Sequence, residues 1–178
     1  NFLSGTIPVS FGDFTSLQWL SLQNNSFVGT IPSQLGSLAQ LQFLSLRINK
    51  LTGSIPSELN KLSKLTELLL EHNLLTGKID NIINVAAQGS LKTIQLNDNL
   101  LTGTLPADIF TLPALVTFAA VSNCFSGPLP SSVCNGTHLH SLILDGLTSA
   151  EACHNNLFPH TVSNSYSLIR SFGGSIPE

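Results

Sequence analysis

The chain has 178 residues, of which 42% are hydrophobic and 10% are charged, so it can form a folded domain with a sizeable core and is not a disordered chain. Its net charge is −3, and its seven lysines and arginines are scattered, which argues against a nucleic-acid-binding face. The uninterrupted apolar runs are too short to cross a bilayer, so we expect no membrane span within the chain. No signal peptide is recognisable at its start.

A repeating unit governs most of the sequence. The same pattern opens, at spacings of 24, 24, 26, 24 and 24 residues, at Leu17, Leu41, Leu65, Leu91, Leu115 and Leu139. An incomplete unit, 1–16, comes first and starts at the ninth position of the pattern. In L-x-x-L-x-L the fourth and sixth positions alternate, as a strand with one buried face requires. One such strand per unit can pair only with the strand of the next unit, in parallel, so the units must stack into a solenoid.

The ninth position of the unit carries an asparagine six times in succession, at Asn1, Asn25, Asn49, Asn73, Asn99 and Asn123. A side-chain amide both donates and accepts hydrogen bonds, so stacked asparagines can satisfy backbone groups that have just left the sheet. We therefore expect a structural asparagine ladder. An apolar residue, a Gly and, in most units, Ile-Pro or Leu-Pro follow each Asn, which favours a bend and then a short extended segment. The back of each turn is expected to be irregular or 3₁₀.

These units resemble the plant-type leucine-rich repeat, LxxLxLxxNxLxGxIPxxLxxLxx, from Asn1 to about Leu144. The resemblance implies a β-rich α/β solenoid: a right-handed superhelix with a parallel concave sheet, a short second sheet near the Gly-x-Ile-Pro segment, and an irregular or 3₁₀ convex side. The same pattern is typical of receptor-like kinase and receptor-like protein ectodomains and of polygalacturonase inhibitors. The resemblance implies that the chain is secreted or displayed on a cell and works by binding.

Two regions depart from the pattern. The unit that opens at Leu65 is two residues longer and has Asp80 where proline is expected, so we expect a bulged or slightly helical back at 82–87. The last unit has Leu147 in place of the asparagine, and the Gly-x-Ile-Pro segment returns only near the end. We therefore divide the chain into leucine-rich repeats at 1–146, a degenerate repeat or island insertion at 147–171, and the start of a further repeat at 172–178.

Three cysteines, an odd count, imply a free thiol or a missing partner in a secreted chain. Cys124 and Cys134 lie in one repeat, on a turn and its return path, and could pair; Cys134 with Cys153 is the competing pair. The Asp-Gly-Leu…Cys stretch with its returning Ile-Pro-Glu also resembles leucine-rich repeat proteins of diatoms. That resemblance implies that Cys153 finds its partner just beyond Glu178. Because the chain begins inside a repeat, we expect the natural protein to be longer at both ends.

The outward residues of the concave sheet are the default binding face of a solenoid. Trp19 and Phe43 occupy the same position in adjacent units and should lie side by side, as an aromatic pair that suits a sugar ring or a peptide anchor. Alternatively, the two rings merely pack together or are covered by a preceding repeat. A polar cluster is expected beside them. The candidate ligand-binding residues are Trp19, Gln23, Phe43, Arg47, Glu67, Glu71, His72 and Asn97.

A second candidate surface is a ladder of hydroxyl side chains around the recurring glycines. Its residues are Ser4, Thr6, Thr30, Thr52, Ser54, Thr76, Thr102 and Thr104. Such a ladder can bind ice or a polysaccharide, but threonine also suits any exposed strand. Val28, Lys78 and Pro128 interrupt the ladder, so ice binding is the less favoured alternative.

The sequence lacks the common catalytic and nucleotide-binding motifs. It contains no Gly-x-Ser-x-Gly, no P-loop and no Gly-x-Gly-x-x-Gly, so we expect neither an enzyme nor a cofactor. His138 and His140 would lie on one side of a strand, but their spacing matches no standard metal site, and we expect no metal.

Two Asn-x-Ser/Thr sequons hint at secretion, at Asn24 on the concave edge and at Asn135 on the convex return. We interpret the chain as an extracellular or cell-surface recognition module that binds a peptide, a protein or a polysaccharide on the concave face. One alternative is a structural subunit of an extracellular assembly or fibre, because solenoid ends expose apolar cores and strand edges through which copies can associate. Another is an enzyme inhibitor of the polygalacturonase-inhibitor type.

Overall fold

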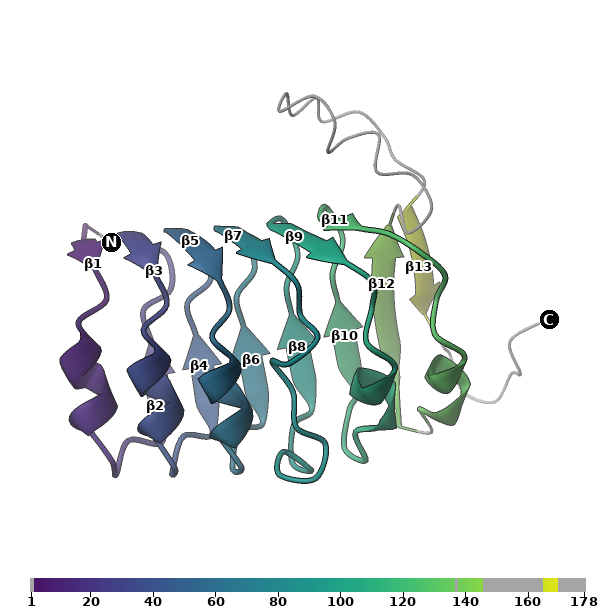
Figure 1. Ribbon diagram of the computed structural model, residues 1–178, viewed down its shortest axis with the longest axis horizontal. Helices are drawn as coiled ribbons and strands as arrows, with labels where there is room; N and C mark the ends of the chain where they lie inside the picture. Colours follow the sequence, from purple (N-terminus) through teal and green to yellow (C-terminus); the bar gives the residue numbers. More distant parts are fainter. Residues whose placement is uncertain (1, 137, 146–164, 170–178) are drawn as a thin grey trace.

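A computed structural model describes residues 2–136, 138–145 and 165–169 of the chain. Its main sheet has seven strands in the order β13-β12-β10-β8-β6-β4-β2 (Figure 1). These strands are β2 (Trp19–Ser21), β4 (Phe43–Ser45), β6 (Glu67–Leu69), β8 (Thr93–Gln95), β10 (Thr117–Ala119), β12 (Ser141–Asp145) and β13 (Ser165–Ile169). One strand per repeat pairs in parallel from β2 to β12, as the leucine spacing predicts. The antiparallel pairing of β13 with β12 was not predicted.

A second parallel sheet runs beside the main one in the order β1-β3-β5-β7-β9-β11. Its strands are β1 (Ser4–Thr6), β3 (Ser26–Thr30), β5 (Lys50–Ser54), β7 (Leu74–Gly77), β9 (Leu100–Gly103) and β11 (Cys124–Phe125). The recurring glycine lies in or beside these strands with a positive φ, as at Gly53 (φ +74°), where a side chain would be strained. The short second sheet that the resemblance implies is therefore present.

Short 3₁₀ helices form the back of five repeats. They are η1 (Val9–Asp13), η2 (Ser33–Ser37), η3 (Ser57–Lys61), η4 (Ala107–Thr111) and η5 (Ser131–Asn135). Each begins directly after a proline whose φ is already close to the helical value. Gly36 allows η2 and η3 to stack closely, since a Cβ atom there would lie 2.4 Å from the carbonyl oxygen of Glu58. None of the helices in the described residues is long and apolar enough to cross a membrane.

The repeat with Asp80 in place of proline has turns where its neighbours have a 3₁₀ helix. A single helical turn forms at Asn84, whose carbonyl oxygen accepts a hydrogen bond from the N–H of Gln88 at 2.8 Å. The fully buried Gln88 side chain ties this turn to the neighbouring repeat by donating to the carbonyl oxygen of Leu59 at 3.1 Å. The slightly helical back that the longer repeat predicts is thus present as one turn.

The core lies between the two sheets and the back of the repeats. The fourth and sixth positions of the strand pattern fill it, as shown by Leu44 and Leu46, which are both fully buried. Burying a leucine side chain contributes roughly 1.5–3 kcal/mol, and each unit contributes several to one continuous core. This stacking explains why the leucine spacing, rather than local propensity, determines the fold.

Candidate binding surface on the main sheet

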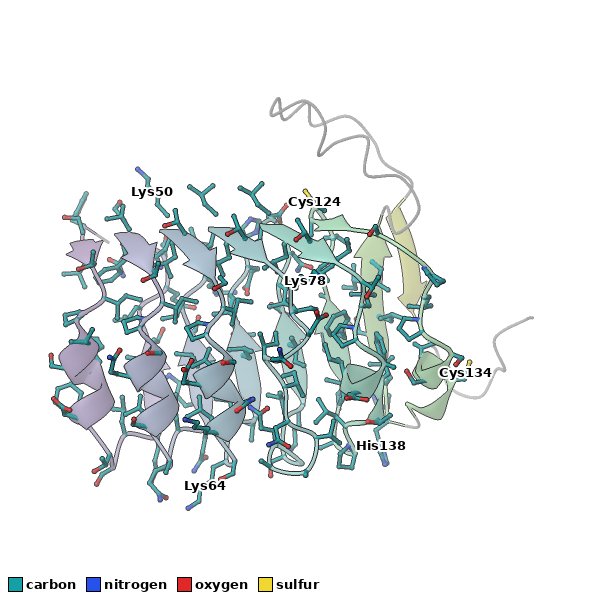
Figure 2. The ribbon with its side chains drawn as sticks, viewed as in Figure 1. Lys50, Lys64, Lys78, Cys124, Cys134 and His138 are labelled. Carbon is teal, nitrogen blue, oxygen red and sulfur yellow. The ribbon has the colours of Figure 1, made fainter. Side chains whose placement is uncertain are left out.

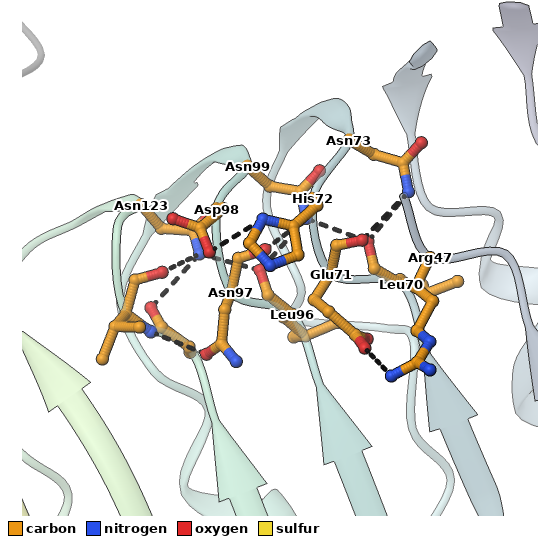
Figure 3. A network of polar contacts seen from close by, with 12 residues as sticks. Arg47, Leu70, Glu71, His72, Asn73, Leu96, Asn97, Asp98, Asn99 and Asn123 are labelled. Carbon is orange, nitrogen blue, oxygen red and sulfur yellow. Dashed lines mark hydrogen bonds and ion pairs between the residues drawn. The ribbon is translucent and has the colours of Figure 1, made fainter. Parts of the chain in front are cut away.

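A row of asparagine side chains crosses the turns that follow the main-sheet strands (Figure 3). The Nδ2 group of Asn73 donates to the carbonyl oxygens of Leu46 at 3.0 Å and Leu70 at 3.1 Å, and its Oδ1 accepts from the N–H of Leu51 at 3.0 Å. Asn49, Asn99 and Asn123 repeat this arrangement, and Asn25 makes its part of it at the first turn. Asn1 lies outside the described residues. These amides bond the backbone of adjacent repeats together.

The residue before each of these asparagines has a left-handed backbone. The φ angles are between +52° and +57° at Asn24, Ile48, His72, Asp98 and Ser122. Such a conformation is unusual for residues other than Gly, Asn and Asp, and especially for a β-branched residue such as Ile48. The hydrogen-bonded asparagine turn therefore fixes the backbone, and the side chains at this position point to an exposed or half-exposed rim.

Trp19 and Phe43 are direct cross-strand neighbours on β2 and β4. Their rings stack with centroids 3.8 Å apart and planes inclined by 8°. Trp19 remains 62% exposed, and β2 is the edge strand of the main sheet in the described residues. The two rings therefore pack against each other and still present a large aromatic surface to solvent.

A row of long polar side chains runs parallel to the asparagines. The Nε of Arg47 donates to Oε1 of Gln23 at 2.7 Å, and its Nη1 lies 3.4 Å from Oε1 of Glu71 (Figure 3). The hydroxyl of Ser45 also donates to Oε1 of Gln23, at 3.2 Å. Glu71 is only 5% exposed, and its Oε2 has no hydrogen-bond partner. This row thus contains a buried carboxylate that is incompletely paired.

The remaining candidate residues lie at the margins of this row. Glu67 is the cross-strand neighbour of Phe43 and forms no ion pair within the described residues. His72 Nδ1 lies 3.1 Å from Asp98 Oδ2 at the exposed rim. Asn97, one repeat further on, accepts the N–H of Val121 at 3.1 Å through its Oδ1. The structure therefore gathers seven of the eight candidate residues around β2, β4 and β6.

Two residues between these rows are buried although their strand positions face outward. Ser45 is completely buried, and Leu69 is 8% exposed. Alternation along the strand correctly assigns them to the outer face, but it does not show that larger neighbours cover them. Ser45 and Leu69 therefore present little of their side chains to solvent.

The hydroxyl ladder of the second sheet is not continuous. Each strand is shifted by two residues against the next, so Thr52 lies opposite Thr30 on one side and opposite Leu74 on the other. Thr76 likewise lies between Ser54 and Leu100. In both rows a leucine follows two hydroxyl side chains, so the ladder is interrupted across the sheet, which weakens the case for ice binding.

The Cys124–Cys134 pair that the sequence left open is wrong, and so is the competing pair of Cys134 with Cys153, because Cys134 is free. Cys124, on β11, is disulfide-bonded, whereas Cys134, on η5, is a free and exposed thiol (Figure 2). The two cysteines lie on different elements, the second sheet and the 3₁₀ back of the repeat. Cys153, for which a partner beyond the chain was expected, lies outside the described residues.

The two sequons lie in different parts of the repeat. Asn24 is exposed on the left-handed rim and is accessible to modification. Asn135 ends η5, and its side chain lies outside the described part of the structure. In that described part, no three His, Cys, Asp or Glu side chains lie close enough to hold a metal ion, and His138 and His140 are exposed.

The back of the irregular repeat has a shallow depression of about 450 Å³ that the sequence pattern did not indicate as a site. It lies where a 3₁₀ helix is replaced by turns, and its polar lining includes Asn60, Asn81, Asn84 and Asp108. The missing proline before Asn81 was the signal that could have located it. The depression is open to solvent on a face opposite the aromatic pair.

The chain matches two family models of the leucine-rich repeat, at residues 15–75 and 90–112. It is 32% identical to a chain of the BIR3–SERK2 complex from Arabidopsis thaliana, covering 74% of this chain and 72% of that one, with a TM-score of 0.61. On this likeness, together with the fold, the chain belongs to the plant-type leucine-rich repeat family. No curated protein sequence matches it.

Two larger plant receptors are also similar to the chain. It is 34% identical to the plant peptide hormone receptor RGFR1, solved in complex with RGF2, with a TM-score of 0.75, covering 79% of this chain and 22% of that one. It is 34% identical to the ectodomain of the Arabidopsis thaliana receptor kinase GASSHO1/SCHENGEN3, solved in complex with CASPARIAN STRIP INTEGRITY FACTOR 2, with a TM-score of 0.76, covering 84% of this chain and 18% of that one. The chain thus spans about a fifth of the length of these receptors.

Proposed function

We propose that the chain is a ligand-binding, non-enzymatic part of an extracellular or cell-surface protein, and that it holds a peptide or protein on the main sheet around β2, β4 and β6. The stacked pair of Trp19 and Phe43 carries this proposal. Exposed aromatic side chains on rigid strands supply contact area at little cost in conformational entropy, and they are enriched among the residues that dominate binding energy. Trp19 is the most suitable anchor because it is 62% exposed on a rigid sheet.

The similar receptors support a peptide or protein as the ligand. RGFR1 and GASSHO1/SCHENGEN3 were both solved with a bound partner of that kind. A solenoid also offers its strand surface, rather than a deep pocket, as a binding face, which suits an extended partner. The proposal extends this mode of recognition to the present chain.

An extracellular location agrees with two features of the chain. Cys124 is disulfide-bonded, and disulfides persist chiefly in oxidising compartments. Asn24, within an Asn-x-Ser sequon, is exposed. Secretion of the chain from plant cells with a glycan at Asn24 would support the location, whereas its accumulation in the cytosol with reduced cysteines would contradict it.

The test of the binding surface uses a library of short random peptides and the purified chain. We expect selected peptides to bind the Trp19→Ala variant at least about tenfold more weakly, because loss of a central aromatic anchor typically costs about 2 kcal/mol or more. Leu74→Ala is the matched control, since Leu74 is a similarly exposed apolar residue, 43% accessible, on β7 of the second sheet. Equal binding to wild type and Trp19→Ala would contradict the proposal.

A further inference from the structure

We propose that the column of Glu67, Leu69 and Glu71 on β6 and its turn selects a positively charged side chain, lysine or arginine, from the peptide ligand. The inference rests on the proposed function and names the class of ligand for the same surface. Two observations carry it: Oε2 of Glu71 is buried without a hydrogen-bond partner, and Glu67, the cross-strand neighbour of Phe43, forms no ion pair within the described residues.

The spacing places the three residues on one face. Successive strand side chains alternate between faces, so positions 67, 69 and 71 share the outer face, and the two carboxylates lie at either end of Leu69. Four residues of extended chain span roughly 13 Å, so one basic side chain reaches one of the two carboxylates at a time. Leu69, between them, is 8% exposed and offers a ligand only a small apolar area.

Glu71 is incompletely satisfied in the free protein. Its side chain is 7% exposed, its Oε2 has no partner, and its Oε1 lies 3.4 Å from the Arg47 guanidinium. That distance is long for a hydrogen bond between charged groups, which is typically about 2.7–2.9 Å. A buried oxygen without a donor is unfavourable, so turning Glu71 toward a donor on the ligand would relieve this cost.

Glu67 provides the second half of the site. Phe43 lies directly beside it on β4, and a ring next to a carboxylate is a combination that attracts cations. On the other side, β8 contributes only the neutral Thr93 and Gln95 opposite Glu67 and Leu69. Arg47, on the turn after β4, is already bonded to Gln23 and Glu71. The charge of Glu67 is therefore available to a ligand.

The experiment compares two libraries of short random peptides, one containing lysine and arginine and one with glutamine in their place, on the purified wild-type chain. We expect the bound fraction to be enriched in lysine or arginine. The basic peptide that binds wild type most tightly should bind the Glu67→Gln/Glu71→Gln double variant about tenfold to a hundredfold more weakly. A loss of this size is typical when a hydrogen bond to a charged group is removed. The peptide's own lysine-to-glutamine version should bind wild type and double variant alike.

The matched control is Asp80→Asn/Asp108→Asn, which removes the same charge from exposed residues on the back. Equal losses in both double variants would overturn the proposal, because attraction would then depend on net charge alone. Selected peptides that lack a basic bias but still require Trp19 would overturn the charge preference and leave the proposed function standing. If no peptide binds at all, both fail. Glu67→Gln alone, at a half-buried site, keeps the test valid should the double variant unfold.

Discussion

Two neighbouring rows of partly buried polar side chains differ in how completely they are hydrogen-bonded. Asn73 is 6% exposed, and each of its amide atoms has a partner in the backbone of two repeats. Glu71, two residues earlier, is 5% exposed, yet one carboxylate oxygen has no partner and the other has a distant one. Equal burial therefore accompanies complete hydrogen bonding in one row and incomplete hydrogen bonding in the other.

The sequence differs between the rows in the same way. The asparagine position is identical in the described repeats from Asn25 to Asn123, whereas the other row reads Gln23, Arg47, Glu71, Asn97 and Val121. A group that bonds the backbone must be the same wherever the backbone repeats. A position that does not bond the repeating backbone can vary from repeat to repeat.

The largest effect is expected in the asparagine row. Asn73→Ala would leave the N–H of Leu51 and the carbonyl oxygens of Leu46 and Leu70 without this partner inside the protein. At about 1–3 kcal/mol for each buried polar group left unsatisfied, we expect a loss of at least about 3 kcal/mol in the free energy of unfolding. Urea unfolding followed by circular dichroism would measure it.

Asn97→Ala is the control in the variable row, because Asn97 accepts a single backbone N–H, from Val121. We expect a loss of about 1 kcal/mol there. If both variants lost the same stability, the distinction between a structural row and a recognition row would be wrong.

A smaller effect, close to zero, is expected from Glu71→Leu. The substitution removes an incompletely paired buried carboxylate, and Arg47, whose side chain is 41% exposed, keeps its bond to Gln23 and can reach water. We expect the free energy of unfolding to change by less than about 1 kcal/mol in either direction, since replacing a buried charge by an apolar group is often neutral or stabilising. A loss as large as that of Asn73→Ala would show that Glu71 is structural.

The repeat made most of the fold predictable, because strands with this leucine spacing can pair only with the strands of neighbouring units, in parallel. The strand of each unit and the 3₁₀ back follow from positions such as Leu44 and Asn49, and the second sheet follows from the resemblance to the plant-type repeat. The asparagine hydrogen bonds follow for the same reason. The antiparallel strand β13 did not follow, because it lies where the repeat pattern is lost.

The site was less predictable than the fold. Alternation placed Trp19 beside Phe43, but it could not show that Glu71 is buried, because burial depends on the rotamers of long neighbouring side chains. The Cys124–Cys134 pair failed because closeness in sequence does not show that the two cysteines lie on different elements, the second sheet and η5. Periodicity along the chain predicts on which face of the sheet a residue lies. The partners of its side chain depend instead on contacts between repeats.

The smallest effect is expected at the rim, where His72 and Asp98 lie 3.1 Å apart with side chains 56% and 42% exposed. Exposed ion pairs contribute about 0–1 kcal/mol, and asparagine tolerates the left-handed backbone of this position (φ +52°) as aspartate does. Asp98→Asn should therefore change the free energy of unfolding by less than about 0.5 kcal/mol. Asp98→Ala removes the same charge but suits that backbone less well, so a greater loss there would assign the cost to the backbone. Equal and large losses in both variants would instead make the ion pair part of the structural framework.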